Sequence, residues 1–426
     1  MTSRLPLLLF CASMTTFLVS GADQTVPGAG NSVAEQIAAK SQFVQSAKQT
    51  LLSNAQGIQD VNLRNITLDA INNPATCIAH RIGVDSNTKN TIVNNLVTAG
   101  LINPADASSI QGGMVAGVFP PILNEGTSCP QLPLSFNAAP GSAFGGHHSY
   151  PGGLPVHEAN NDQSSINFAE LYRGSYGSFG GHGLPAVKGE KREAAVFISQ
   201  DLMLAAPMWH DWAKPMVFQW NSDGTEFTEL NFGGNGTTDA WGAPGDSRTG
   251  GHHIIGIAES MKRGLSPEMV ITQASAHSAP TSGNEYKVVN WLRAAAMIAQ
   301  IDPVQAGYLI YDSQNNLRLP PLRQLANGVN LNANGQTNLL VEYALHNLSD
   351  SDFNLSGPAV ADAQVVLATA APQFGYDPSN TTTYNTKYRN VALANLSAER
   401  LLMIYGNSGL QGVVAELKLL RQQGLI

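Results

Sequence analysis

The sequence predicts a mainly α-helical protein with one β-hairpin inserted among the helices. Apolar residues recur at helical spacing in several segments, most clearly over 285–302, where Pro303 ends the pattern. Helix start signals such as Ser266-Pro267-Glu268 precede these segments. The range 218–230 instead has strand-like residues on either side of a turn at 221–224, which predicts the hairpin.

Residues 1–22 are typical of a cleavable secretory signal. Arg4 supplies the positive start, an apolar run follows it, and small residues at 20–22 suit cleavage. No later apolar run approaches the roughly 20 residues that span a bilayer. We therefore expect a secreted or periplasmic protein without a membrane span.

Two cysteines, Cys77 and Cys129, remain beyond this signal. In an oxidising compartment two thiols usually form one disulfide, which would join these residues across the N-terminal region. Two buried free thiols are the alternative. The same region contains His80, which stands alone in the sequence and is expected to be structural.

Beyond the signal, composition divides the chain into three ranges. Residues 23–135 are polar and rich in Asn and Gln, and several short segments among them have apolar residues at helical spacing. This pattern predicts an N-terminal helical region. Residues 136–310 contain the candidate metal-binding and catalytic motifs and are expected to form the metal-binding domain. Residues 311–426 form a C-terminal helical region, whose last helix should break near Gly406–Gly409.

The net charge is −8, from 31 acidic and 23 basic side chains. Proteins that bind polymeric nucleic acid usually have a basic surface, because neutralisation of phosphates dominates their affinity. The charge therefore disfavours a polymeric nucleic acid as partner and favours a small substrate. The sequence gives no indication of the oligomeric state.

Histidines gather in the middle of the chain. Eight of the ten lie between His147 and His277. The neutral imidazole is the commonest metal ligand in proteins, and catalytic sites collect such residues from distant points of a sequence. The range 145–302 therefore predicts a metal site.

Three helices are expected to present these histidines. Pro155 suits the first turn of a helix that carries His157. A second helix should run over 193–210, with a kink or break at Pro207 just before the site. A third should open at His252, which we prefer over its neighbour His253 because the two point about 100° apart on a helix.

The dipeptide His210-Asp211 is the most informative motif. An imidazole beside a carboxylate at the end of an apolar helix offers two adjacent ligands, and the carboxylate can bridge two cations. Bridged metals about 4 Å apart can activate a water and stabilise the departing oxygen of a phosphoester.

Taken in order, the motifs resemble those of HD-domain metal-dependent phosphohydrolases. They read His147-His148-Ser-Tyr-Pro-Gly-Gly-Leu-Pro-Val-His157, His210-Asp211-Trp-Ala-Lys214, Gly251-His252, Ser275-Ala-His277 and Asp302. The first is most similar to the motif of YhaM-type exoribonucleases, and the resemblance covers residues 144–305. It implies an HD-domain helical bundle that binds two divalent metal ions, which would be Mn, Mg, Zn or Fe.

The resemblance also implies roles for individual residues. The implied metal ligands are His157, His210, Asp211, His252, His277 and Asp302. Asp211 and Lys214 would be catalytic, and Lys214 would also bind the substrate phosphate, whose charge an ammonium offsets. His147 and His148 would bind substrate, or else order the Gly-rich loop that contains them. His182 is expected to be an exposed loop residue.

The expected function is that of a secreted metal-dependent phosphohydrolase that cleaves a small phosphoester or nucleotide-like substrate with a metal-activated water. The chain departs from the family pattern at Trp212-Ala213 and Ser278, and it shows no counterpart of the exoribonuclease OB fold. Two alternatives stay open. One is a di-iron HD-fold oxygenase, since six His and Asp ligands suit iron as well. The other is a non-catalytic extracellular protein that retains the fold.

All five tryptophans also lie in this part of the chain. They are Trp209, Trp212, Trp220, Trp241 and Trp291. They would form either an aromatic wall on which a base could stack or, as we prefer, part of the core.

Overall fold

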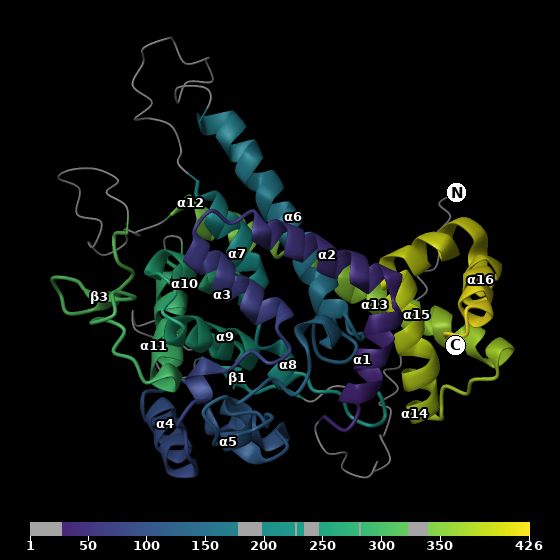
Figure 1. Ribbon diagram of the computed structural model, residues 1–426, viewed down its shortest axis with the longest axis horizontal. Helices are drawn as coiled ribbons and strands as arrows, with labels where there is room; N and C mark the ends of the chain where they lie inside the picture. The colour runs from purple at the N-terminus through teal and green to yellow at the C-terminus, as the bar shows by residue number, and fades with distance from the viewer. Residues whose placement is uncertain (1–27, 178–197, 226–227, 234–246, 281–282, 323–339) are drawn as a thin grey trace, which may run out of the picture.

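The structure is a computed structural model of the chain. It describes residues 28–177, 198–225, 228–233, 247–280, 283–322 and 340–426. The expected signal at 1–22, His182 and Trp241 lie outside these residues. The described part is mainly α-helical, as the sequence predicts (Figure 1).

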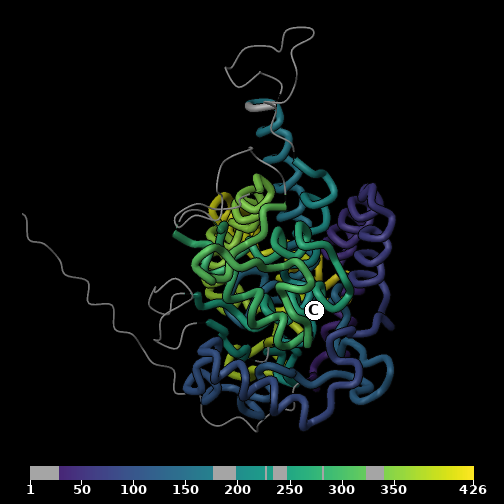
Figure 2. Tube along the Cα trace, turned by 90° about the vertical axis from the view of Figure 1, so that its left-hand side faces the viewer, coloured from purple at the N-terminus to yellow at the C-terminus, as the bar shows by residue number. Residues whose placement is uncertain are grey.

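The described N-terminal region contains five α-helices, three of which begin at a side chain that accepts a hydrogen bond from the first turn. They are α1 (Asn31–Lys40), α2 (Gln42–Gln56), α3 (Val61–Asn72), α4 (Ser86–Thr98) and α5 (Gly113–Val118). Ser41, Asp60 and Asp85 cap α2, α3 and α4 respectively. Figure 2 shows this segment, purple to blue, along one side and the lower edge of the molecule.

The central helices carry the motif residues. They are α6 (Gly153–Tyr172), α7 (Gln200–His210), α8 (Lys214–Val217), α9 (Gly251–Lys262), α10 (Pro267–Ala274) and α11 (Glu285–Ala299). Ser266 caps α10 by accepting a hydrogen bond from the Met269 N–H, as its sequence signal predicts. Pro207 lies inside α7 and does not end it.

The C-terminal helices pack partly on the central helices and partly on the N-terminal ones. They are α12 (Val341–Ser349), α13 (Phe353–Ala370), α14 (Thr381–Tyr384), α15 (Asn390–Leu396) and α16 (Ala398–Gln422). Gly409 interrupts α16 with a φ of 60°, which confirms the break expected near this position.

The predicted hairpin over 218–230 is described only in part, because residues 226–227 lie outside the described residues. The turn is present, because the Asn221 N–H donates to the Thr225 carbonyl at 2.6 Å. However, β1 (Asn231–Phe232) pairs antiparallel with β2 (Thr249–Gly250), and β3 (Ile310–Tyr311) pairs with β4 (Leu317–Arg318). Trp220 donates from its backbone N–H to the Asn31 side chain and from its indole N–H to the Ala138 carbonyl, so it also contacts the N-terminal region.

A single cluster of buried apolar side chains runs from Ala34 to Leu420 and includes residues of all three expected ranges. Helix α6 contacts α2, α7 and α12, and α13 contacts α16. The Ser41 hydroxyl, at the start of α2, donates to the Ala394 carbonyl of α15 at 2.6 Å and so joins the N-terminal and C-terminal helices. The expected N-terminal, central and C-terminal ranges therefore pack through one core.

Cys77 and Cys129 form the expected disulfide. Next to it, Arg263 at the end of α9 donates to the Cys77 carbonyl and to the Glu259 carboxylate, and its guanidinium lies over the rings of Trp209 and Trp212. These contacts fasten the disulfide segment to the helices that carry the candidate site.

His80 is buried and donates from Nδ1 to Glu259 at 2.7 Å, in agreement with a structural role. Burial lowers the pKa of His80, against the opposing effect of Glu259. The hydrogen bond connects the N-terminal region to α9.

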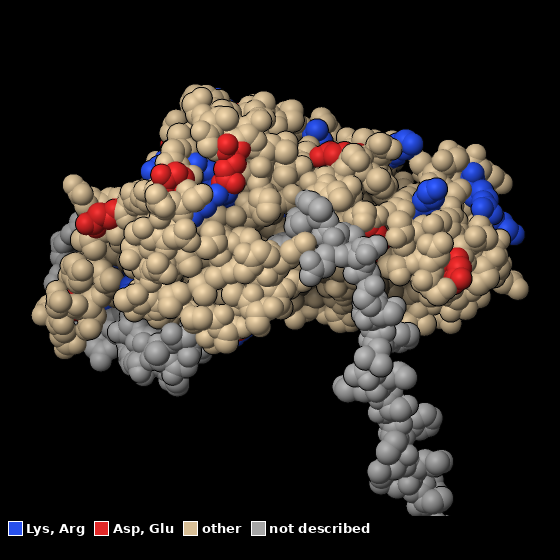
Figure 3. Space-filling model, turned by 90° about the horizontal axis from the view of Figure 1, so that it is seen from below, with Lys and Arg blue, Asp and Glu red and all other residues tan. Residues whose placement is uncertain are grey.

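Among the described residues, no helix is both long and apolar enough to cross a membrane. On the face shown in Figure 3, Lys and Arg side chains are few and lie scattered among Asp and Glu. A basic stripe that would follow a nucleic-acid backbone is not seen on that face.

Candidate metal centre

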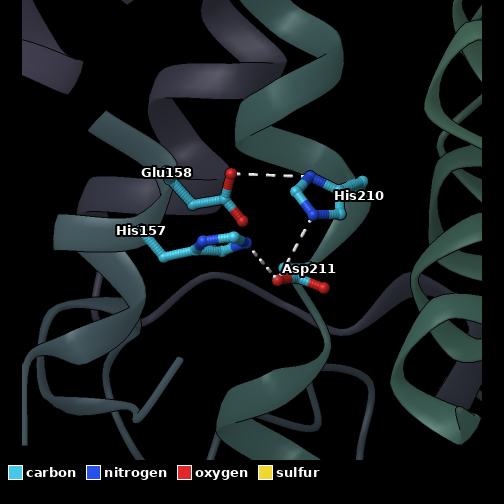
Figure 4. Close-up of side chains that lie close together, drawn as sticks. All are labelled: His157, Glu158, His210 and Asp211. Atoms are coloured by element: carbon cyan, nitrogen blue, oxygen red, sulfur yellow. Dashed lines mark ion pairs between the residues drawn. The ribbon is translucent and has the colours of Figure 1, made fainter. Parts of the chain in front are cut away.

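The candidate site is a cavity of about 640 Å³ between the N-terminus of α6, the α7–α8 turn, the start of α9 and the α12–α13 turn. Its polar lining includes His147, His157, Asp211, Lys214, Glu229, His252, His277 and Asp350. Figure 4 shows the side chains of His157 and Glu158 from α6, which face those of His210 and Asp211 at the end of α7; of these four, His157 and Asp211 line the cavity.

The Asp211 carboxylate stands between two groups of imidazoles. Its Oδ2 lies 3.4 Å from His157 Nε2 and 3.3 Å from His210 Nε2. Its Oδ1 lies 3.2 Å from His252 Nε2. The two oxygens therefore face different histidines, which is the arrangement that a bridging carboxylate requires.

Three of these imidazoles are oriented by a partner at Nδ1. His157 donates to Asp352 at 2.9 Å, His210 to the Pro207 carbonyl at 2.9 Å and His252 to Glu229 at 2.6 Å. In the neutral form of each imidazole Nδ1 therefore carries the proton, and Nε2 has a lone pair that can bind a metal ion. Partners of this kind fix the tautomer of metal-binding histidines.

The lone pairs of His157, His210 and His252 point at carboxylate oxygens, and two acceptors repel unless a cation lies between them. The Nε2 of His210 and the Oδ1 of Asp211 are buried and have no hydrogen-bond partner. Four groups of His, Asp and Glu here could hold a metal ion, since the ligand atoms of each group lie within 4.8 Å of one another. The residues present therefore fit a metal centre.

The pKa values of these histidines also indicate that the site favours a positive charge. Burial opposes a charged imidazole, yet the nearby carboxylates hold the pKa of His157 and of His210 well above the usual value. For His252, Glu229 and Asp211 overcome the effect of burial and raise the pKa to about 9. The gaps between Nε2 and the carboxylates thus favour a positive charge, which either a proton or a metal ion can supply.

Asp302, an expected metal ligand, lies elsewhere. It is exposed at the end of α11, and its carboxylate accepts hydrogen bonds from the Val304 and Gln305 N–H groups. Asp350 stands in the cavity instead, with Oδ1 3.1 Å from His157 Nε2 and 3.4 Å from His210 Nε2. The structure therefore does not bring Asp302 to the other candidate ligands, and Asp350 is the aspartate that lies beside them.

The α12–α13 turn brings two carboxylates to the site. Asp350 faces the cavity, while Asp352 accepts from both His157 Nδ1 and His148 Nε2. The sequence analysis missed both residues because they lie outside the histidine-rich range. The available signal was His346, four residues before Asp350 at the end of the same helix, where the two can share a face.

Two glutamates were also missed. Glu229 accepts from both the backbone N–H and Nδ1 of His252. Gly250 makes room for this pair, since a Cβ there would lie 2.6 Å from Glu229 Oε1 and from His252 Cε1. Glu158 is fully buried beside His157 with no hydrogen-bond partner for either oxygen, and burial raises its pKa to about 8.

Lys214 lies where the sequence placed it, beside Asp211. Its ammonium donates to the Asp211 carboxylate and to the Gly141 carbonyl. It is the one Lys or Arg among the described residues that line the cavity. Lys214 therefore offsets only part of the negative charge of Asp211, Glu229 and Asp350.

The two histidines of the Gly-rich loop have different positions. His147 lines the cavity with its ring centroid 4.9 Å from that of His157, and burial together with Lys214 lowers its pKa to about 2. His148 is buried outside the cavity lining and bonds Asp352 and Tyr150. Of the two expected substrate-binding histidines, His148 instead orders the loop.

The remaining histidines surround the site. His277 is exposed to the cavity, and its Nδ1 lies 2.8 Å from the Thr249 hydroxyl. His253 is buried, donates to the Ala274 carbonyl and stacks on the His277 ring with centroids 4.1 Å apart. Thus His252 faces Asp211, while His253 supports His277.

The described tryptophans belong to the core. Trp209, Trp212, Trp220 and Trp291 are all buried, and each indole N–H donates to a protein oxygen. The aromatic wall considered from the sequence is therefore not formed by these four residues.

Comparison with family models, curated proteins and solved structures gives no match for this chain.

Proposed function

We propose that the protein is a secreted metal-dependent phosphohydrolase of the HD type that acts on a small phosphoester. The observation that carries this proposal is the division of the Asp211 carboxylate between His157 and His210 on one side and His252 on the other. One carboxylate that faces two sets of imidazole lone pairs suits two cations better than one.

The ligands separate into two sets. His157, His210, Asp211 and Asp350 would hold one ion, and Asp211, His252 and His277 would hold the other. Glu158 lies within reach of the first set. This is the order of ligands that the HD resemblance implies, with Asp350 as the closing carboxylate. When bound, divalent cations of this kind activate water and neutralise phosphate charge.

The protein's own groups would position the substrate. Lys214 lines the cavity and is held by Asp211 and the Gly141 carbonyl, so its ammonium is fixed beside the bridging carboxylate. His147 is kept neutral by burial and offers a ring nitrogen to the same cavity. A volume of about 640 Å³ suits a small molecule, and the excess of acidic side chains disfavours polyanions.

Metal analysis and turnover together test the proposal. We expect about two divalent ions per natively purified chain and chelator-sensitive hydrolysis of bis(4-nitrophenyl) phosphate or a phosphomonoester. Asp211→Asn should lose metal and turnover, whereas Lys214→Met should keep the metal and lose turnover about 100-fold or more.

Metal content near zero would overturn the proposal. Bound iron, oxygen consumption and no phosphoester cleavage would favour the di-iron oxygenase, and intact metal with neither activity would favour a non-catalytic protein.

A further inference from the structure

A second cavity, of about 570 Å³, lies between α2 and α6 and is bounded by the first turns of α13 and α16. It shares no lining residue with the cavity of the candidate metal centre. Its apolar wall is formed by side chains of α2, α6 and α13, namely Phe43, Ala47, Val156, Ala159 and Leu355. Phe43 and Leu355 keep 37% and 70% of their surface exposed, so a ligand can reach this wall from solvent.

The charged side chains of this cavity are two carboxylates. Asp352 and Glu399 line it, and no Lys or Arg does so among the described residues. Asp352 precedes α13 but does not cap it; its carboxylate accepts from His148 and His157 instead, and 15% of its side chain stays exposed. The cavity therefore combines an apolar wall with negative charge that no neighbouring Lys or Arg offsets.

Glu399 has an oxygen atom that lacks a hydrogen-bond donor. It is the second residue of α16, where a carboxylate complements the positive end of the helix dipole. That position accounts for the charge, but Oε1 is buried and has no hydrogen-bond partner in the described part of the chain. A buried carboxylate oxygen without a donor is costly, so a ligand that donates to it gains free energy on binding.

We infer that this second cavity binds a small primary amine in its charged form, with the ammonium at Glu399 and Asp352 and the alkyl part along the apolar wall. An ammonium group has three hydrogen-bond donors and offsets carboxylate charge. An alcohol of the same length cannot offset the charge, and a carboxylic acid in its ionised form is repelled. The inference does not depend on the proposed function, because it concerns a different cavity.

Three six-carbon ligands that differ in their head group test the inference. They are n-hexylammonium, 1-hexanol and hexanoate. In NMR titrations of the full chain near neutral pH, we expect n-hexylammonium to bind about 10-fold more tightly than 1-hexanol, because its hydrogen bonds to a carboxylate join two charged groups. Hexanoate should bind most weakly.

Replacement of Glu399 locates the bound amine. Glu399→Gln should lower the affinity for n-hexylammonium about 10-fold and leave that for 1-hexanol unchanged, which also shows that the variant is folded. Glu399→Asp keeps the carboxylate on a shorter side chain and should lower the affinity for the amine by less. Leu355→Ala should weaken both ligands by a similar factor of about 3, because the apolar wall contacts both alkyl chains.

Glu268→Gln is the matched control. Glu268 is likewise the second residue of a helix that a serine caps, but it lies outside the cavity, so its replacement should change neither affinity. Equal affinity for n-hexylammonium and 1-hexanol, no binding of either, or an ammonium preference that persists in Glu399→Gln would overturn the inference. Loss of the preference in Glu268→Gln would overturn it as well, since the net charge of the protein would then explain the binding.

Discussion

Glu229 and His252 form a carboxylate–imidazole pair in which Glu229 Oε2 accepts from His252 Nδ1 at 2.6 Å and from its backbone N–H at 3.1 Å. The pair leaves His252 Nε2 directed at Asp211 Oδ1. Its partner residue comes from a segment between the turn at Asn221 and strand β1, so tertiary packing creates the pair.

Replacing this carboxylate tests whether it orients a ligand. Glu229→Gln should weaken binding of one of the two metal ions by about 10- to 100-fold, because the amide accepts a weaker hydrogen bond from Nδ1. Competition with a calibrated chelator measures the affinity of each ion. An unchanged affinity for both ions would show that Glu229 does not act through His252.

A second prediction contrasts two aspartates. Asp350→Asn should lower the metal content by about one ion per chain, because Asp350 faces His157 and His210. Asp302→Asn should leave the content unchanged, since Asp302 only accepts hydrogen bonds from the backbone of its own turn. Elemental analysis of both variants decides between them, and the opposite pattern would restore the assignment made from the sequence.

A third prediction concerns the disulfide. Cys77 and Cys129 are separated by 52 residues, and closing a loop of that length stabilises the folded state by about 4 kcal/mol. The double variant Cys77→Ala, Cys129→Ala should lose about that free energy of unfolding, as measured by urea denaturation. Reduction of the unmodified protein should reproduce the loss, and a difference below about 1 kcal/mol would contradict it.

A fourth prediction concerns Asp162 on α6, which is buried, accepts from the Asn54 side chain and has one oxygen without a partner. Burial raises its pKa from 3.8 to about 7. The folded state therefore holds this proton where the unfolded chain has lost it, so stability falls as pH rises from about 4 to about 7 and the loss persists above that.

Asp162→Asn removes this dependence. The variant should match the unmodified protein near pH 4 and exceed it at pH 8, with an upper limit of about 4 kcal/mol in the free energy of unfolding. Asp85→Asn, the same change at the exposed cap of α4, should show no gain at pH 8. A difference for Asp162→Asn that does not change with pH would contradict the raised pKa.

Local sequence patterns were sufficient to predict where several helices begin or break. Ser266-Pro267 marks the start of α10 and Gly409 marks the break in α16, because capping and glycine conformations depend on a few adjacent residues. For the predicted hairpin over 218–230, the described residues show the turn, in which the Asn221 N–H donates to the Thr225 carbonyl. Strand partners are chosen by long-range packing, and here β1 pairs with Thr249–Gly250 beyond the predicted segment.

The residues of the candidate site also differ in how far the sequence could predict them. His157, the His210-Asp211 pair, His252 and His277 could be named from motifs, since each lies at the end of a helix whose position the local sequence fixes. Asp350, Asp352 and Glu229 could not, because their roles depend on α12 packing against α6 and on the segment beside β1 reaching the start of α9. The sequence around a single Asp or Glu does not indicate which histidine its carboxylate will contact in the folded protein.

The sequence by itself thus determined the helical class, the disulfide pair and the imidazoles that could bind metal. Only the tertiary structure decided which carboxylates complete the site, which nitrogen of each histidine is free, and that the described tryptophans are buried. The physical reason is that helix signals act over a few residues, whereas ligand geometry depends on distances between segments that meet only when the core forms.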